Sequence, residues 1–360
     1  MNGLKTDAKK VLVAMSGGVD STVAVKLLKE KGFQVAGATM RLLPGCDKQV
    51  ERAQKAAERL GIDFYVFDLE KEFSGAVKQY FCKAYENGRT PNPCVVCNKT
   101  VKFGLFLDKA LAMGFDFIAT GHYARIEADR DGRLKLKKAL CLQKDQSYFL
   151  FGLNQSIMEK VIFPLGGVDS KETVRELARS EMLENSEERD SQDICFVPDG
   201  NYIEIIEKYY AENGKTRRPG SFVDTEGNVI GTHGGMERFT IGQRKGVGMT
   251  LGGEPMYVIA KRAEDGAVIM GRDELLYTDT LTVIDPNFPW LKKGETPPSA
   301  HGGLQLKTRS GQKTVPASLE YDSVNNVVTA RVEKPLRAAA PGQFAVFYEG
   351  DEVYCGGEIQ

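Results

Sequence analysis

The sequence lacks a long apolar run of any kind. Its longest apolar stretches, such as residues 11–15 and 34–40, fall far short of the roughly 20 residues that a membrane-spanning helix needs. Residues 1–10 contain no apolar core of the kind that a secretion signal requires. We therefore expect a cytoplasmic protein without a membrane segment.

The sequence also lacks an excess of charge of either sign. Lysine and arginine total 48, aspartate and glutamate total 49, and the formal net charge is −1. A nucleic acid would therefore have to bind local basic clusters, although such clusters are more often only a solvated surface. The candidate clusters are Lys135, Lys137, Lys138 and Lys144, then Arg217 and Arg218, then Arg238, Arg244 and Lys245.

Cysteine and histidine are both scarce. Seven cysteines at irregular spacing argue against a secreted disulfide framework and favour reduced thiols. Cys94 and Cys97 form a Cys-x-x-Cys pair, which on its own fits a zinc half-site, a redox pair, a cluster ligand or coincidence. Zinc is the weakest of these, because the chain has only three histidines and no second paired-ligand motif.

The sequence contains neither a Walker phosphate loop nor a dinucleotide-binding glycine motif after a predicted strand, which removes support for a kinase or a dehydrogenase. It has instead Ser16-Gly17-Gly18-Val19-Asp20-Ser21, placed between an apolar strand and a helix. Asp20 or Ser21 is a natural N-cap residue for that helix. Backbone N–H groups at such a helix start form an anion cradle, so the loop predicts a phosphate site.

The first part of the chain alternates predicted strands with predicted helices. This pattern favours an open, mostly parallel, doubly wound α/β sheet over residues 1–212, with ligands at the carboxyl ends of its strands. Residues 125–138 alternate around Asp131-Gly132 and predict a hairpin insertion. After residue 213 short alternating runs predict two small β-rich domains, at 213–275 and 276–360. The expected strands are 11–15, 34–40, 63–69 and 116–120, and the expected helices are 21–31, 48–60, 72–87, 98–113, 146–153, 171–180 and 202–211.

Two cysteines have surroundings that suggest chemistry. Cys97 is expected near the start of the helix at 98–113, with Lys99 close by, and both features lower the pKa of a thiol. Cys195 follows the acid-rich stretch 181–190. The remaining cysteines, apart from Cys94, are expected to be small buried or inert residues: Cys46, Cys82, Cys141 and Cys355.

The phosphate loop resembles that of the PP-loop pyrophosphatase superfamily, whose fold is of the adenine nucleotide alpha hydrolase type. Further motifs along the whole chain resemble the bacterial tRNA-specific 2-thiouridylase family. The motifs are residues 15–21, 90–103 apart from Cys94, 120–125, 144–150, 193–196, 239–244 and 341–348.

The resemblance implies that ATP, with Mg²⁺, adenylates the C2 oxygen of a wobble uridine in tRNA. It implies that a persulfide on Cys195 supplies sulfur, that Cys97 releases it, and that a desulfurase or a sulfur-relay protein loads it. The ATP-binding residues would be Ala14, Met15, Ser16, Gly17, Gly18, Val19, Asp20, Ser21, Met40 and Gly121. The tRNA-binding residues would be Asn92, Pro93, Cys94, His122, Lys144, Asp145, Gln146, Arg309, Ser310 and Gln343.

Cys94 departs from the family pattern, because many members have aspartate there. Cys94, Cys97 and Cys195 together would supply three thiolates, enough for a 4Fe–4S cluster with one open iron. A persulfide route with Cys94 as a bystander is the other possibility for these thiols.

Two other functions compete with thiolation. One is a different PP-loop ligase that makes a C–N bond, which would need no thiols. The other is a non-catalytic tRNA-binding or sulfur-carrier protein, against which the intact phosphate loop argues.

Overall fold

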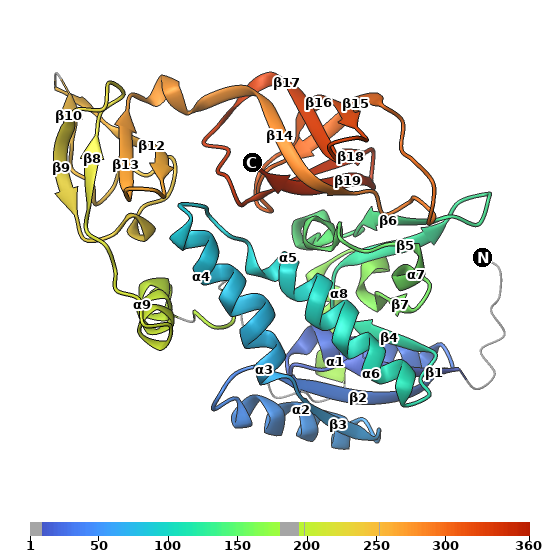
Figure 1. The fold of residues 1–360 in the computed structure, drawn as a ribbon. Helices are drawn as coiled ribbons and strands as arrows, with labels where there is room; N and C mark the ends of the chain where they lie inside the picture. The colour runs from blue at the N-terminus through green and yellow to red at the C-terminus, as the bar shows by residue number, and fades with distance from the viewer. Residues whose placement is uncertain (1–8, 181–193, 198, 252) are drawn as a thin grey trace.

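The computed structural model describes residues 9–180, 194–197, 199–251 and 253–360. A parallel sheet with helices forms the first part of the chain, and two β-rich units follow it. Figure 1 shows the parallel sheet at the bottom, the strands between residues 220 and 271 (β8–β13) at the upper left, and the strands between residues 277 and 359 (β14–β19) at the upper right. The predicted fold class is confirmed.

The parallel sheet has the strand order β3-β2-β1-β4-β7. The chain moves outward from β1 to β3 and then returns to the other side of β1 with β4. The order therefore reverses between β1 and β4, and at such a switch point the loops diverge and leave a crevice for ligands. The strands are β1 (Lys10–Ala14), β2 (Gln34–Arg41), β3 (Phe64–Asp68), β4 (Phe117–Thr120) and β7 (Val161–Ile162).

Both faces of the parallel sheet are covered, which explains the unbroken apolar run in β1. Val11 and Val13 pack against α1 (Val19–Glu30) and α2 (Asp47–Arg59). Leu12 points to the other face, where Phe106 of α6 covers it. The other helical segments before α6 (Phe106–Ala112) are α3 (Glu70–Phe73), η1 (Ser74–Lys78), α4 (Gln79–Glu86), α5 (Pro93–Cys97) and η2 (Asn98–Leu105).

The predicted hairpin is present as β5 (Ala124–Ala128) and β6 (Leu134–Lys138). This hairpin is part of the C-terminal sheet, because β6 pairs with β19. Lys135 Nζ lies 2.6 Å from the Glu352 carboxylate across this junction, and both side chains are largely buried. The hairpin thus fixes the C-terminal sheet to the first part of the chain (Figure 1).

In the β-rich part, the described residues form two larger sheets and one short ribbon. One sheet has the order β12-β13-β8-β9. In the other, β14 pairs with both β17 and β19, so the six strands β14 to β19 close into a ring. The strands are β8 (Gly220–Val223), β9 (Val229–His233), β10 (Thr250–Leu251), β11 (Glu254–Pro255), β12 (Tyr257–Arg262), β13 (Ala267–Gly271), β14 (Tyr277–Asn287), β15 (Ala300–Lys307), β16 (Val315–Asp322), β17 (Val327–Arg337), β18 (Phe344–Glu349) and β19 (Glu352–Ile359).

Short helical segments complete the described chain. The helix expected at 146–153 is only a 3-10 turn over Ser147–Leu150, since the Asp145 carboxylate accepts the backbone N–H groups of Ala139 and Ser147 instead. None of the helices in these ranges is long and apolar enough to cross a membrane. The segments are η3 (Leu142–Lys144), η4 (Ser147–Leu150), α7 (Gln155–Met158), η5 (Pro164–Gly167), α8 (Lys171–Ser180), α9 (Tyr202–Glu212), η6 (Met236–Arg238) and η7 (Asp273–Leu276).

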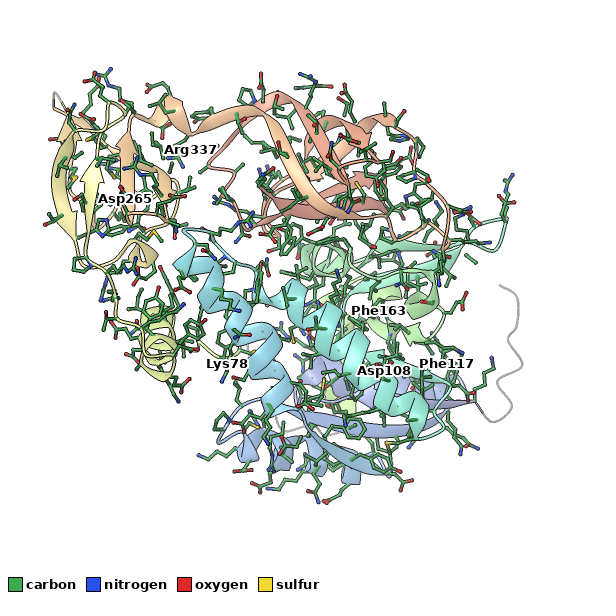
Figure 2. The ribbon with its side chains drawn as sticks, viewed as in Figure 1. Lys78, Asp108, Phe117, Phe163, Asp265 and Arg337 are labelled. Carbon is green, nitrogen blue, oxygen red and sulfur yellow. The ribbon has the colours of Figure 1, made fainter. Side chains whose placement is uncertain are left out.

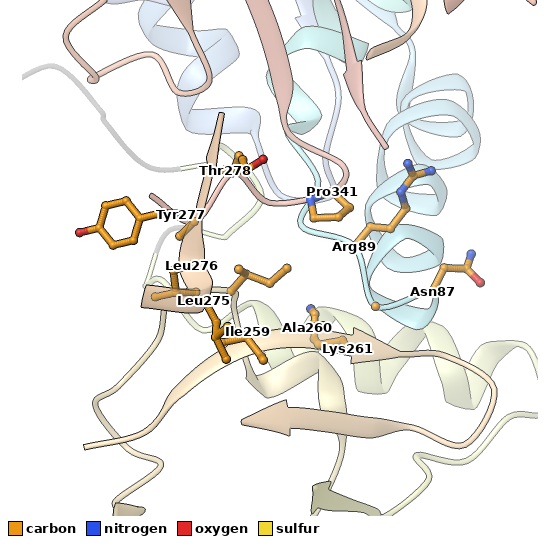
Figure 3. Close-up of a pocket in the computed structure, with 14 residues that line it drawn as sticks. Asn87, Arg89, Ile259, Ala260, Lys261, Leu275, Leu276, Tyr277, Thr278 and Pro341 are labelled. Atoms are coloured by element: carbon orange, nitrogen blue, oxygen red, sulfur yellow. The ribbon is translucent and has the colours of Figure 1, made fainter. Parts of the chain in front are cut away.

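A cavity of about 310 Å³ lies where the three parts of the chain meet (Figure 3). Arg89 after α4, Lys261 of β12 and Tyr277 of β14 contribute to its wall. Lys261 donates a hydrogen bond to the Phe239 carbonyl at 2.9 Å, and burial lowers its pKa to about 8. The ring of Tyr85 lies 5.7 Å from Lys261 Nζ and stacks on Tyr202 of α9 at 4.7 Å. The contacts among Tyr85, Tyr202 and Lys261 thus connect α4, α9 and β12.

Candidate functional site

The candidate site is a pocket of about 390 Å³ at the carboxyl edge of the parallel sheet. The ends of β1, β2 and β4 supply one wall, and the helical turn at 93–97 and residues 194–196 supply another. It lies at the switch point between β1 and β4. Of the predicted site residues, it brings together Ala14, Met15, Ser16, Asp20, Ser21, Met40, Gly121, Pro93, Cys94, Cys97, His122, Gln146 and Cys195.

The phosphate loop is braced by its own side chains. The Ser21 hydroxyl donates to the Gly18 carbonyl at 3.0 Å and accepts the Ser16 N–H at 3.3 Å. Helix α1 begins at Val19 with Gly18 as its N-cap. The prediction of Asp20 or Ser21 as the N-cap was therefore wrong, since both already lie within the first helical turn. That shift leaves the Asp20 carboxylate at the pocket rather than on the helix end.

Two glycines allow the loop to pack tightly. Gly17 has a φ of +78°, and a Cβ there would lie 2.9 Å from Arg52 Cβ of α2. A Cβ on Gly121 would lie 3.0 Å from both Asp20 C and Ser21 N. Gly121 thus lets the end of β4 approach the loop backbone closely. The shape of the anion cradle depends on both positions.

The Asp20 carboxylate already has two partners. The Tyr123 hydroxyl donates to Asp20 Oδ1 at 2.8 Å, and the Lys171 ammonium forms an ion pair with the same oxygen. Lys171 is the first residue of α8, and its Nζ also lies 5.7 Å from the Tyr123 ring. The sequence motifs did not single out Lys171, which lies far from the loop in the chain.

The three thiols of the pocket are held in their neutral form. Burial raises the pKa of Cys97 to about 11 and also raises the pKa of Cys94 and Cys195. The expected lowering of the Cys97 pKa is therefore wrong. The helical run begins at Pro93, so Cys97 lies in the second turn, away from the helix end.

The expected cation was also misplaced by one helical turn. The Lys99 side chain lies alongside Gly152. Lys102 faces the pocket instead, and its charge opposes the rise in pKa at Cys94, Cys97 and Cys195. Among the described residues that line this pocket, Lys102 is the only lysine or arginine.

Cys195 is positioned by the aromatic residue that follows it. The Phe196 ring packs edge-on against Phe73 and Phe81, with ring centres 5.8 Å and 5.2 Å away, in a core formed by α3, η1 and α4. Part of the Cys195 side chain is exposed, although the protein around the thiol still raises its pKa. The acid-rich stretch 181–190 and Asp193 lie outside the described residues. The packing of Phe196 therefore holds the neighbouring Cys195 in place beside the pocket.

His122 is a neutral imidazole in this structure. Its Nδ1 lies 2.7 Å from the Thr120 hydroxyl, and its ring packs near Phe103 and Phe163, the latter labelled in Figure 2. Burial, with Lys102 nearby, lowers the pKa of His122 well below its usual range. The Thr120 oxygen also accepts the His122 N–H at 3.4 Å, so its O–H is free to donate to Nδ1. We assign the ring proton to Nε2.

The three thiols do not form a metal site. Among the residues that the structure describes, no three His, Cys, Asp or Glu side chains are arranged to hold a metal ion. Cys94, Cys97 and Cys195 all line this pocket. The predicted 4Fe–4S cluster finds no support in this arrangement.

The remaining predicted site residues lie around the pocket or away from it. Gln343 Nε2 donates to the Thr90 carbonyl at 3.0 Å and so holds the loop before Asn92 and Pro93 against the C-terminal barrel. The Asp145 carboxylate accepts the N–H groups of Ala139 and Ser147, which fixes the turn that carries Lys144. Arg309 and Ser310 lie exposed in the loop after β15, outside the pocket.

Comparisons with known proteins cover nearly the whole chain. Residues 9–199 match the family described as tRNA methyl transferase HUP domain. Residues 207–272 match tRNA methyl transferase PRC-barrel domain, and 278–359 match Aminomethyltransferase beta-barrel domain. Among solved structures, an NMN synthetase from Francisella tularensis is similar over 59% of this chain and 80% of its own, at 15% identity and a TM-score of 0.34, too distant to bear on function.

Curated relatives are much closer. A tRNA-specific 2-thiouridylase MnmA from Acetivibrio thermocellus is 42% identical over 98% of this chain and 99% of its own length. Proteins of the same name from Caldicellulosiruptor saccharolyticus and Treponema denticola are 42% and 43% identical, each over 98% of this chain and of its own length. The chain therefore belongs to the tRNA-specific 2-thiouridylase family.

Proposed function

We propose that this chain is an ATP-dependent sulfurtransferase that converts a wobble uridine of tRNA to 2-thiouridine. The observation that carries the proposal is a single pocket holding both the phosphate loop, Ser16 to Ser21, and the thiols of Cys97 and Cys195. A C–N ligase of the same fold would have no use for these thiols. The names of the curated relatives support the same activity.

In the first step the phosphate loop orients ATP. The uridine C2 oxygen attacks the α-phosphorus, the bond from that phosphorus to the bridging oxygen breaks, and pyrophosphate leaves. The uridine N3 proton is lost, and C2 now carries AMP as a leaving group. The residues that we assign to ATP are Ala14, Met15, Ser16, Gly17, Gly18, Val19, Asp20, Ser21, Met40 and Gly121.

Mg²⁺ fits this site as a companion of ATP. A magnesium ion is usually held by one or two carboxylates together with substrate phosphates, and it needs no cage of protein ligands. Asp20 is the carboxylate at the phosphate end of the pocket. It would hold the ion, whose chemistry is to neutralise charge on the departing pyrophosphate.

In the second step sulfur replaces AMP. The terminal sulfur of a Cys195 persulfide attacks C2, and AMP departs with its electron pair. The Cys97 thiolate then attacks Cys195 Sγ, the bond between the two sulfurs of the former persulfide breaks, and the electron pair stays on the sulfur at C2. The N3 proton returns as 2-thiouridine forms. A Cys97–Cys195 disulfide remains, which an external thiol reduces.

Lys102 supplies the charge that this second step needs. The Cys97 thiol rests in its neutral form because burial raises its pKa. The positive charge of Lys102 on the same pocket wall stabilises an anionic sulfur when one forms. Cys94 is exposed, and we give it no role in the transfer.

Transfer RNA would approach the open side of this pocket. We propose that Asn92, Pro93, Cys94 and His122 contact the target base, with the His122 Nε2–H as a hydrogen-bond donor. Outside the pocket the tRNA residues would be Lys144, Asp145, Gln146, Arg309, Ser310 and Gln343. We propose a catalytic unit at 1–212, β-rich units at 213–275 and 276–360, a cytoplasmic location, and a cysteine desulfurase or sulfur-relay protein as the persulfide donor.

The test is direct formation of 2-thiouridine. The protein is incubated with ATP, Mg²⁺, unmodified tRNA and a persulfide donor, and the digested nucleosides are quantified by mass spectrometry. Wild type should form 2-thiouridine, and Cys97→Ser and Cys195→Ser should lose it while still releasing pyrophosphate. Cys46→Ala is the matched control, since Cys46 lies outside the pocket lining. Wild-type yield in Cys97→Ser would overturn the mechanism.

A further inference from the structure

The phosphate loop holds its own carboxylate in an ion pair. Asp20 lines the pocket, and Lys171 of α8 forms an ion pair with it. The two side chains are only 28% and 14% exposed, so the pair is partly shielded from water. Partial shielding strengthens the interaction and makes an unpaired charge here costly. Neither charge would therefore be left without a partner when a ligand enters.

The charge of ATP requires a cation beside the phosphate loop, where the described pocket lining supplies none. A triphosphate carries several negative charges, and the loop itself contributes a further one at Asp20. Lys102, the lysine found in the described lining, lies on the thiol wall, where it acts on Cys97 and Cys195. Lys171 is a cation held at the loop by a direct contact, its ion pair with Asp20.

Local packing keeps Lys171 beside the loop. Its Nζ lies 5.7 Å from the ring centre of Tyr123, and the Tyr123 hydroxyl donates to the same Asp20 oxygen. Helix α8 packs on α1 through Val174 and Ala178, which meet Val23 in one buried cluster. The base of the Lys171 side chain is thus rigidly placed beside the first turn of α1.

We propose that Lys171 is a phosphate-binding residue, held in reserve by Asp20 and released to the β- and γ-phosphates when ATP and Mg²⁺ bind. This inference rests on the proposed ATP-dependent function. Asp20 would hold Mg²⁺ through its carboxylate, and the ammonium of Lys171 moves to the phosphate oxygens. Asp20 exchanges the ammonium of Lys171 for the magnesium ion, and Lys171 exchanges the carboxylate of Asp20 for a phosphate, so neither charge is left unpaired.

The proposal predicts a selective loss of phosphate affinity. A charge-assisted hydrogen bond corresponds to about a 10- to 100-fold change in affinity. Lys171→Met should therefore weaken binding of ATP and of inorganic pyrophosphate by about that factor and leave AMP binding unchanged. Lys171→Arg should recover most of the loss, because it keeps the charge.

The matched control is Arg175→Met, one turn along the same helix. Arg175 forms an ion pair with Glu172 at 3.7 Å and lies outside the pocket lining. Binding is measured by titration calorimetry, and each variant is first checked for an unchanged melting temperature. Lys171→Gln, which keeps a polar side chain of similar length, replaces the methionine variant if the latter melts early.

The exchange itself has a separate test with pyrophosphate in the absence of Mg²⁺. Asp20→Asn removes the carboxylate that pairs with Lys171, so this variant should bind pyrophosphate more tightly than wild type, and Lys171→Met in that background should cancel the gain. Wild-type pyrophosphate affinity in both Lys171→Met and Lys171→Gln, or an equal loss of AMP affinity, overturns the proposal. Failure of the thiolation assay with a normal Lys171 effect would instead refute the proposed function alone.

Discussion

The pKa of Cys97 gives a prediction that can be worked through numerically. Burial raises this pKa to about 11, whereas an ordinary cysteine thiol has a pKa of 9.0 on the same scale. At pH 8 the thiolate fraction is therefore about one in a thousand, compared with about one in ten for the ordinary thiol. Because only the thiolate reacts, the alkylation rate of Cys97 should rise about tenfold per pH unit from pH 7 to pH 10.

The assay is alkylation with isotopically labelled iodoacetamide, followed by mass spectrometry of the peptide that contains Cys97. Limited access slows the reaction equally at every pH, so the midpoint of the profile reports the pKa. Lys102→Met should move the midpoint upward, because the nearby charge that favours the thiolate is removed. Lys102→Arg should leave it near the wild-type value. A midpoint below pH 9, or an unchanged midpoint in Lys102→Met, would refute the reasoning.

Two further predictions concern packing and pH. Gly121→Ala should lower ATP affinity by about tenfold or more, because overpacking against the loop costs about 1–3 kcal/mol. Gly167→Ala, whose Cβ meets nothing within 4 Å, should leave ATP affinity unchanged, and titration calorimetry measures both variants. Folding lowers the pKa of Lys261 from 10.5 to about 8. Between pH 8 and pH 10.5 the lysine is therefore protonated in the unfolded state only, and the free energy of unfolding increases as the pH rises through this range. In denaturant titrations, wild type should gain up to about 3 kcal/mol over Lys261→Met from pH 8 to 10.5, and a constant difference would contradict this.

The phosphate loop and the parallel sheet could be predicted from the sequence because their signals are local. Val11, Leu12 and Val13 lie in a strand, β1, that is buried on both faces, which leaves a continuous apolar run in the sequence. The two glycines after Ser16 mark the turn from strand to helix. A resemblance over many separate motifs then supplied Cys97 and Cys195 as partners.

The position of the charges could not be predicted, because it depends on helix phase and on long-range packing. The helical run begins at Pro93 and already includes Cys97, so Lys99, two residues further on, does not share the face of Cys97. The following π-helical stretch, Asn98–Leu105, carries Lys102 on the pocket wall with the thiols. Lys171 reaches Asp20 only because α8 packs on α1. Burial, which a sequence does not give directly, reversed the expected shift in the Cys97 pKa.

The central claim is that one pocket joins ATP activation to sulfur transfer through Cys97 and Cys195. Its most direct test is a single turnover of protein loaded with persulfide on Cys195, analysed by mass spectrometry for both 2-thiouridine and the Cys97–Cys195 disulfide. We predict that the two products appear together, one for one, and only when ATP and unmodified tRNA are both present. Formation of 2-thiouridine without the disulfide would contradict the account.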